Sequence, residues 1–227
     1  THIVRLSPRV AKVRSLAGLL ANEALTLPYY RNAGLQDWVN RTIREEKIYA
    51  AVVFSSAMAQ YVNGFPQLRT LVDFVDVDSA KWTQYAPDHR WPLSWLYRRE
   101  GQRLLAFERE VAAMAAHSFF VTENETALFL RHTPECQNKV SPMCNGVDAD
   151  FFSPQHELTS PYLPDELPLV FTGAIDYWPN IDAVRWFVQE ILPQLLPRWP
   201  ALRFYIVGRS PAAAVQELAG ERVVVTG

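Results

Sequence analysis

The pattern of apolar and polar positions is clearest between residues 169 and 208. An apolar run, Leu169–Thr172, stops at a glycine, as a buried parallel strand typically does. A second run, Leu202–Val207, stops in the same way. Between them Asn180 suits the cap of a helix, and apolar residues then recur every three to four positions: Ile181, Val184, Phe187, Val188, Ile191, Leu192 and Leu195. The pattern predicts two parallel strands joined by a right-handed helical crossover.

A second unit of the same kind follows directly. Pro193 is expected to kink or end the first helix, because proline has no N–H to donate. Ser210–Pro211 suits the start of another helix, Ala212–Ala219, which Gly220 would end. Arg222–Thr226 is then predicted as a third strand.

The first half of the chain shows the same alternation. Strands are predicted at Tyr49–Phe54, Arg69–Val77, Ser118–Thr122 and Lys139–Met143. Helices are predicted at Leu35–Glu46, Pro92–Ala116 and Glu123–His132. Strand–helix alternation on this scale predicts an α/β protein with parallel sheets. Ligands of such sheets bind where the strands end, which in the second half means residues 173–180 and 208–210.

Two carboxylates mark the end of one predicted strand. Asp76 and Asp78 share one side of the extended chain, and Asp73 faces the other. Because an unpaired carboxylate inside a parallel strand is costly, Asp76 and Asp78 are expected at or beyond the strand's end, facing a cleft. An equally good alternative is that both are turn and cap residues. The charges of the long helix, which include Glu100 and Glu108, are interpreted as a solvated face.

The first 22 residues carry positive charge and no acidic residue. Val10, Val13, Leu16, Ala17 and Leu20 recur at helical spacing. The basic residues of this segment are Arg5, Arg9, Lys12 and Arg14. A basic amphipathic helix of this kind can lie on an anionic membrane, so residues 1–22 suggest peripheral membrane contact. The alternative is an ordinary surface helix.

Composition excludes several classes. The chain has 227 residues, 49% of them hydrophobic, which suffices for real hydrophobic cores. Its net charge of −2 gives no field that would recruit nucleic acid. Cys136 and Cys144 lack metal-ligand spacing and are expected to be free thiols in a reducing cytoplasm. The sequence shows neither a membrane-spanning run nor a signal peptide, which favours a cytoplasmic location.

The sequence indicates a domain boundary in the middle of the chain. Asn145-Gly146 is a tight-turn dipeptide, and the stretch from Pro154 to Pro168 is rich in proline and polar residues. We therefore expect an N-terminal domain over residues 1–148, a linker over 149–168 and a second domain over 169–227. A cleft between two α/β domains is a common place for a nucleotide-bearing substrate.

Several phrases resemble one enzyme family. NGVDADFFSP at residues 145–154 resembles a signature at the domain junction of GT-B glycosyltransferases of the family-four type. LVFTGAIDYWPNIDAVRWF and RFYIVGRSP look like the opening strands of that family's donor-binding domain. DFVDVDSAKW, YRREGQRLLAFE and VTENETALF resemble one subgroup, the sugar transferases associated with PEP-CTERM/exosortase exopolysaccharide loci in bacteria.

The resemblance implies a fold and an activity. The fold would be GT-B-like, with two Rossmann-like domains, of which the second is incomplete here. The activity would be retaining transfer of a sugar from a nucleotide-diphosphate sugar to a glycan or lipid-linked acceptor, without an essential metal or other cofactor. The location expected from the free thiols and from the basic residues 1–22, and not from the resemblance, is the cytoplasm, with peripheral contact at the inner face of the bacterial inner membrane. Such an enzyme stabilises the departing diphosphate with backbone amides, helix N-termini and basic side chains.

The chain departs from the family pattern in four places. Ala174 and Asn180 stand where many relatives carry Arg and Lys for the diphosphate, and Arg209 is the nearest basic substitute. Ser55-Ser56 stands where relatives often have His. The Glu-x7-Glu motif of the family belongs beyond residue 227, and Glu100 and Glu108 match its spacing only by coincidence. The glycine-rich N-terminal loop is also missing. We therefore expect a catalytically inactive fragment whose unpaired sheet edge could pair with a second copy.

The candidate site residues follow from the resemblance and the strand ends. Asp76 and Asp78 are the candidate catalytic residues, including the base that accepts the acceptor hydroxyl's proton. Candidates for acceptor binding are Ser55, Ser79, Lys81 and Trp82. Candidates for donor binding are Gly173, Asp176, Asn180, Gly208 and Arg209.

Two other functions remain open at this stage. Asp76-Val77-Asp78 matches the Asp-x-Asp motif of GT-A glycosyltransferases, in which carboxylates hold Mn²⁺ or Mg²⁺ against the diphosphate. A non-catalytic module that binds sugars or nucleotides is the other alternative.

Overall fold

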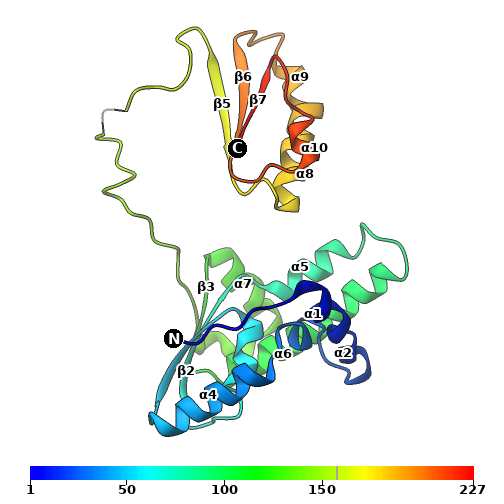
Figure 1. Cartoon of the computed structure of the whole chain (residues 1–227), viewed down its shortest axis with the longest axis vertical. Coiled ribbons are helices and arrows are strands. Elements are labelled where there is room, and N and C mark those ends of the chain that lie inside the picture. The colour runs from blue at the N-terminus through cyan, green and yellow to red at the C-terminus, as the bar shows by residue number, and fades with distance from the viewer. Residues whose placement is uncertain (157) are drawn as a thin grey trace. The chain divides into compact units, whose positions relative to one another are not determined.

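The computed structural model describes residues 1–156 and 158–227 and contains two compact units, Thr1–Asp148 and Ala149–Gly227 (Figure 1). Each unit has its own sheet and its own hydrophobic core, and both sheets are parallel throughout. The predicted α/β class with parallel sheets is confirmed. None of the helices in the described residues is both long and apolar enough to cross a bilayer.

The first unit places its strands in chain order. The sheet runs β1-β2-β3-β4, with β1 Ala50–Phe54, β2 Arg69–Val75, β3 His117–Phe120 and β4 Val140–Pro142. Each strand is one or two residues shorter than predicted. Phe74 and Phe120 stack at 5.0 Å between ring centroids and pack against Phe129 in the core. These three rings are the largest fully buried side chains among the described residues.

The helices of the first unit fall into two groups. Before the sheet come α1 Pro8–Ser15, α2 Ala17–Leu20, α3 Thr26–Tyr30 and α4 Ala33–Glu45. A 3₁₀ helix, Ser56–Tyr61, follows β1, and a second one, Pro134–Lys139, precedes β4. Between and after the strands come α5 Asp78–Tyr85, α6 Leu93–Met114 and α7 Glu123–His132. The single basic helix expected over residues 1–22 is thus two short helices.

The second unit contains a three-stranded sheet of order β5-β6-β7, with β5 Leu167–Thr172, β6 Leu202–Val207 and β7 Val223–Thr226. Its helices are α8 Trp178–Trp186, α9 Leu192–Leu195 and α10 Ala213–Gln216, and a π-helical turn, Phe187–Ile191, joins α8 to α9. Figure 1 shows these helices on one side of the sheet. The strands match the predicted ones closely, and β5 begins two residues earlier.

Two predicted helix starts in this unit are wrong, and the prediction for Pro193 is met in part. Asn180 is the third residue of α8 instead of its cap, because the helix begins with Trp178-Pro179 and proline is well suited to a first turn. Ser210 has a left-handed backbone (φ 54°), so α10 begins only after Ala212 and is short. Pro193 does not end the helix, since helical structure continues through α9, but the π-helical turn directly before it is the kind of irregularity expected of a kink.

Both cysteines are free, as expected. Cys136 is buried in the first unit's core, and Cys144 is exposed.

Candidate functional site

The carboxyl ends of β1 and β2 carry a strained backbone. Ser55 and Val75 both have positive φ, 73° and 68°. For Val75 this is a genuine outlier, because a β-branched side chain disfavours the left-handed region. The register of β2 against β3 shifts between Asp73 and Val75, and the Asp73 carboxylate accepts a hydrogen bond from the Val75 N–H at 3.0 Å. Strain of this kind concentrates where a structure positions functional groups.

Asp76 and Asp78 lie directly after that distortion and share one cation. The Lys81 Nζ is 2.7 Å from Asp76 Oδ2 and 3.2 Å from Asp78 Oδ1. Asp78 is the first residue of α5, where a negative charge also suits the helix dipole. Burial alone would lower the pKa of Lys81, but the hydrogen bond to Asp76 and the charge of Asp78 outweigh it and raise the pKa above its ordinary value. The ammonium therefore stays charged across the whole physiological range.

The cavity beside this ion pair has a volume of about 460 Å³ and lies between α1, α3, α5 and α6. Aromatic side chains form much of its wall: Tyr29, Tyr30, Trp82 and Tyr97. Trp82 and Tyr97 are in direct contact, with ring centroids 5.2 Å apart. Asp78 and Ser55 supply polar groups to the same lining. Aromatic walls with a few polar groups are typical of small-molecule sites. A sugar can bind to both, with its ring faces on the aromatic side chains and its hydroxyl groups on the polar ones.

The structure brings some of the predicted acceptor-side residues together and separates others. Ser55, Asp78 and Trp82 all line the cavity. Asp76 and Lys81 do not line the cavity. Lys81 connects Asp76 to Asp78, which does line it. Ser79 is 3% exposed, and its hydroxyl donates to Glu108 Oε2 at 2.5 Å, so it points into the protein instead of toward a ligand.

Sequence reasoning missed the cavity's tyrosines. Burial raises the pKa of the Tyr30 hydroxyl, and the neighbouring Tyr29 and the negative charge of Asp78 raise it further. Tyr30 therefore remains a protonated donor at the same cavity as Asp78. The only signal in the sequence is the pair Tyr29-Tyr30 beside Pro28, which has no helical or strand periodicity and gave no reason to single it out.

The interpretation of the charges of α6 as a solvated face is wrong for two carboxylates. Glu100 and Glu108 are buried, not part of a solvated face. Glu100 accepts hydrogen bonds from the Leu25 N–H at 2.6 Å and from the Thr26 N–H at 2.9 Å, so it caps the start of α3. Burial raises the pKa of Glu108 to about 8, against the opposing effect of its hydrogen bond with Ser79. The spacing could have revealed both, because Glu100, Leu104 and Glu108 share one face of the helix.

The candidate donor-side loops of the second unit lie against each other. Gly173 N–H donates to Val207 O at 3.1 Å, and Ile175 N–H donates to Arg209 O at 3.3 Å. A Cβ on Gly208 would lie 1.8 Å from the Gly173 carbonyl oxygen, so only glycine fits there. The loops that follow β5 and β6 are thus joined into one backbone surface at the strands' carboxyl ends.

Side chains at this surface divide into structural and exposed ones. The Asn180 amide donates to Ala174 O at 3.0 Å, so it fixes the loop that follows β5. A Cβ on Gly173 would lie 2.8 Å from the Asn180 Nδ2, so a larger residue at position 173 would displace this amide. Asp176 and Arg209 are exposed and remain available to a ligand. Among the described residues, no group of three or more His, Cys, Asp or Glu side chains is arranged to hold a metal ion.

Comparison with known proteins gives one family match and weak structural similarities. The S. aureus MnaA–UDP structure is 15% identical with a TM-score of 0.48, and the alignment covers 85% of this chain and 50% of that one. A candidate UDP-N-acetylglucosamine 2-epimerase from Listeria monocytogenes is 14% identical with a TM-score of 0.44, covering 84% and 49%. The chain thus spans about half the length of these structures.

No curated protein is significantly similar to the chain in sequence. A family model does match: residues 166–227 match the family described as "Glycosyl transferases group 1". The match begins beside the first residue of β5 and continues to the end of the chain, so it covers the whole sheet of the second unit and both of its glycine-containing loops.

Proposed function

We propose that the chain is part of a glycosyltransferase that moves a sugar, with retention of configuration, from a nucleotide-diphosphate sugar to a glycan or lipid-linked acceptor. The observation that carries this proposal is the family match over residues 166–227. Several sequence phrases also resemble sugar transferases that are associated with exopolysaccharide loci. We therefore extend the proposal to bacterial exopolysaccharide synthesis at the cytoplasmic face of the inner membrane.

The second unit supplies the donor side in this proposal. Gly173 and Gly208 let the loops after β5 and β6 lie against each other, so that both loops can offer backbone to a diphosphate at one strand end. Arg209 provides positive charge at the same strand end, and a charge-assisted hydrogen bond to a phosphate oxygen is about twice as strong as a neutral one. Asp176 is exposed on the loop after β5 and is placed to accept hydrogen bonds from hydroxyl groups. Asn180 acts by holding that loop in position.

The first unit supplies the acceptor side. The aromatic walls of the cavity offer apolar surface for the faces of a sugar ring, and Ser55 adds a hydroxyl. Asp78 lines the cavity and is the candidate base for the acceptor hydroxyl, because its carboxylate is held by Lys81 and lies 3.5 Å from the Ser56 hydroxyl. Asp76 orients Lys81 by its shorter contact, and Ser79 orients α5 through Glu108.

Metal-dependent transfer through Asp76-Val77-Asp78 would need a rearrangement of these residues. The two carboxylates already share the Lys81 ammonium, at 2.7 and 3.2 Å. A divalent cation would have to displace that ammonium before it could bind both aspartates. We therefore assign the pair to acceptor chemistry, and the proposed reaction needs no metal ion and no cofactor besides the nucleotide sugar.

Nucleotide-sugar binding tests the proposal most directly. We expect one class among UDP-, GDP- and ADP-sugars to raise the Tm of the chain in a concentration-dependent way, because a ligand that binds only the folded state stabilises it. The substitution Arg209→Ser should weaken that shift, and Arg185→Ser, on the exposed part of α8, is the matched charge control. If no nucleotide sugar changes the Tm at millimolar concentration, the proposal fails.

Pairing of two copies through a sheet edge remains a second, independent proposal. In the described residues β5 pairs only with β6, and its Leu169 and Val170 side chains are exposed. An unpaired edge of this kind is a template for another strand. Sedimentation equilibrium should then detect a dimer that Val170→Lys abolishes, because a charge on an edge strand opposes pairing.

A further inference from the structure

Helices α1 and α2 pack in an unusual orientation. Their small residues face the body of the first unit: Ala11, Ser15 and Gly18 are buried. The contact at Gly18 is close, since a Cβ there would lie 3.1 Å from Leu25 Cδ2 and 3.3 Å from Pro28 Cγ. The small side chains therefore let the helices approach closely, and the large apolar side chains are left on the opposite face.

That outer face is apolar. Its members recur at helical spacing and are all exposed: Val10, Val13, Leu16 and Leu20. Val13 is 72% exposed and Leu20 93% exposed, although a helix on a protein surface normally turns such residues inward. A contiguous apolar face of this kind usually marks a site of interaction.

The segment that carries the apolar face is also positively charged. Residues 1–22 contain no acidic residue, and Arg5 and Arg9 are exposed. Arg14 has a different role, because its guanidinium donates to the Pro28 and Tyr29 carbonyl oxygens at 3.0 Å and fixes α1 to α3. The outer surface of this segment is thus both apolar and cationic.

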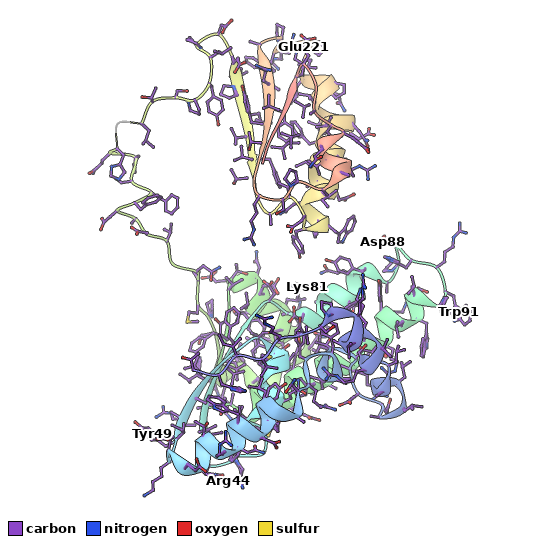
Figure 2. The ribbon with its side chains drawn as sticks, in the orientation of Figure 1. Arg44, Tyr49, Lys81, Asp88, Trp91 and Glu221 are labelled. Atoms are coloured by element: carbon purple, nitrogen blue, oxygen red, sulfur yellow. The ribbon has the colours of Figure 1, made fainter. Side chains whose placement is uncertain are left out.

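The connection between α5 and α6 has the same character. Trp91 is 81% exposed in this connection, and Leu93 and Trp95 are exposed in the first turn of α6 that follows it. The exposed Arg90 and Arg98 flank them, with one acidic residue, Asp88, in the connection. Figure 2 shows Asp88 and Trp91 at the far end of this helical hairpin, opposite Arg44 and Tyr49 within the first unit. Exposed tryptophan next to arginine is typical of segments that lie at a membrane interface.

Both apolar segments border one cavity. Lys12 and Ser15 of α1 and Leu96 and Tyr97 of α6 line the acceptor cavity described above. The Arg99 guanidinium also donates to the Gly18 and Glu23 carbonyl oxygens, each at 3.0 Å, and so joins α6 to α2. The exposed apolar and basic residues of the two segments do not line the cavity themselves, but they lie on or beside the helices that do. We call these residues the collar: Arg5, Arg9, Val10, Val13, Leu16 and Leu20 with Arg90, Trp91, Leu93, Trp95 and Arg98.

We propose that this collar docks on an anionic lipid surface and thereby brings the helices that line the cavity close to the membrane. The apolar side chains enter the boundary between headgroups and acyl chains, and the arginines bind the anionic headgroups. A second copy of the chain is a poorer occupant, because two arginine-rich collars would repel each other. The docking itself does not depend on glycosyl transfer. Its consequence, that the cavity receives a lipid-linked acceptor directly from the membrane, rests on the proposed function.

Vesicle binding tests the docking with the whole chain. We expect co-sedimentation with vesicles of phosphatidylcholine containing phosphatidylglycerol, much weaker binding to pure phosphatidylcholine vesicles, and a decrease with added salt. The double variant Arg5→Ser/Arg9→Ser should bind about thirtyfold more weakly, at the usual contribution of a basic residue near an anionic surface. The triple variant Val13→Ser/Leu16→Ser/Leu20→Ser should lose at least about tenfold.

Control variants distinguish effects on docking from effects on folding and on the overall charge. Arg44→Ser/Arg131→Ser removes the same charge from α4 and α7 and should leave binding unchanged. All substituted side chains are exposed, so each variant should keep the wild-type Tm. Fluorescence of Trp91 and Trp95 should be quenched by brominated lipids, and Trp91→Phe/Trp95→Phe should remove that quenching.

Two outcomes would overturn the proposal. One is binding to anionic vesicles that is absent or is unchanged by the collar substitutions. The other is a dimer in solution that the triple variant dissociates, which would assign the apolar face to a second copy. Nucleotide-sugar binding is measured separately, so failure of the docking and failure of the proposed function are distinguishable.

Discussion

The Ser79 hydroxyl donates a hydrogen bond of 2.5 Å to Glu108 Oε2, and Glu108 is 0% exposed between α5 and α6. The Ser79 N–H adds a longer bond, 3.3 Å, to Oε1. These bonds fix the first turn of α5, where Asp78 faces the cavity. A buried carboxyl group thereby positions the candidate base without touching a ligand.

The raised pKa of Glu108 predicts a pH dependence of stability. Glu108 titrates at about 8 in the folded protein because burial disfavours its charged form, against 4.5 for an exposed group. Between these values the folded state holds a proton that the unfolded state has released, so the free energy of unfolding falls as pH rises from about 4.5 to about 8. The fall is on the order of a few kcal/mol and ends above pH 8.

Glu108→Gln should remove this dependence, because the amide keeps the shape and the acceptor oxygen but does not titrate. We expect the variant to be more stable than the wild type at pH 9 and to gain little at pH 5, as measured by urea denaturation. Glu110→Gln, on the exposed face of the same helix, is the control and should follow the wild type. Equal pH slopes for wild type and Glu108→Gln would contradict the assignment.

The contact between α5 and α6 predicts a strong effect at Gly101. A Cβ at this position would lie 2.3 Å from Thr83 Oγ1 and 2.8 Å from the Ser79 carbonyl oxygen. Gly101→Ala would gain up to about 1 kcal/mol of helix propensity, but overpacking costs about 1–3 kcal/mol, so we expect net destabilisation.

The second substitution Thr83→Ala should recover part of that loss, because it removes one of the two clashing atoms and leaves the carbonyl. Urea denaturation of the two single variants and the double variant gives the coupling between the sites. Gly64→Ala, where nothing lies within 4 Å of the added Cβ, is the control. Additive effects of Gly101→Ala and Thr83→Ala would show that the helices do not meet as described.

Prediction from sequence succeeded where apolar runs were continuous. The strands β5 and β6 and the parallel pairing of the second unit follow from runs that end at glycine, because a buried strand needs apolar residues on both faces. Helix boundaries were less predictable. Asn180 is a good cap residue in general, yet Pro179 shifted the start of α8 and left Asn180 to bind the Ala174 carbonyl instead.

The candidate site was predictable only in part, for a physical reason. Asp76 and Asp78 lie at a strand end, and strand ends of parallel sheets meet at one edge, so their place followed from local pattern. The cavity walls come from α1, α3, α5 and α6, and no local pattern says which of their faces meet. Glu100 and Glu108 were misinterpreted because charged residues are rarely buried. Their place on the same helix face as Leu104 was the one signal in the sequence, and their tertiary partners explain why they are buried.

Lys81 should contribute little to stability but decide the affinity of the aspartate pair for cations. Its side chain is 39% exposed, and exposed ion pairs are worth about 0–1 kcal/mol, so Lys81→Met should lower the free energy of unfolding by no more than about 1 kcal/mol. The variant leaves Asp76 and Asp78 without their shared cation, and Mn²⁺ should then bind more tightly than to the wild type. Isothermal titration with Mn²⁺ checks this, and Arg98→Met serves as a charge control. Equal Mn²⁺ affinities would show that Lys81 does not occupy the place of a cation.

Gly208 should be the least replaceable residue of the second unit. The Cβ of Gly208→Ala would lie 1.8 Å from the Gly173 carbonyl oxygen, and because that oxygen is part of the backbone, no side-chain rotation relieves the contact. The loops after β5 and β6 would have to separate, and the hydrogen bond from Ile175 N–H to Arg209 O would be lost. We expect destabilisation of the second unit by more than about 3 kcal/mol, at the upper end for a single substitution.

Hydrogen exchange should show faster exchange of β5 and β6 amides in Gly208→Ala and unchanged exchange in β1–β4. The control is Gly220→Ala, whose added Cβ meets nothing within 4 Å and should leave both sheets protected. Protection of β5 and β6 that survives Gly208→Ala would mean that the two loops do not lie in contact, and the donor-side surface proposed here would lose its basis.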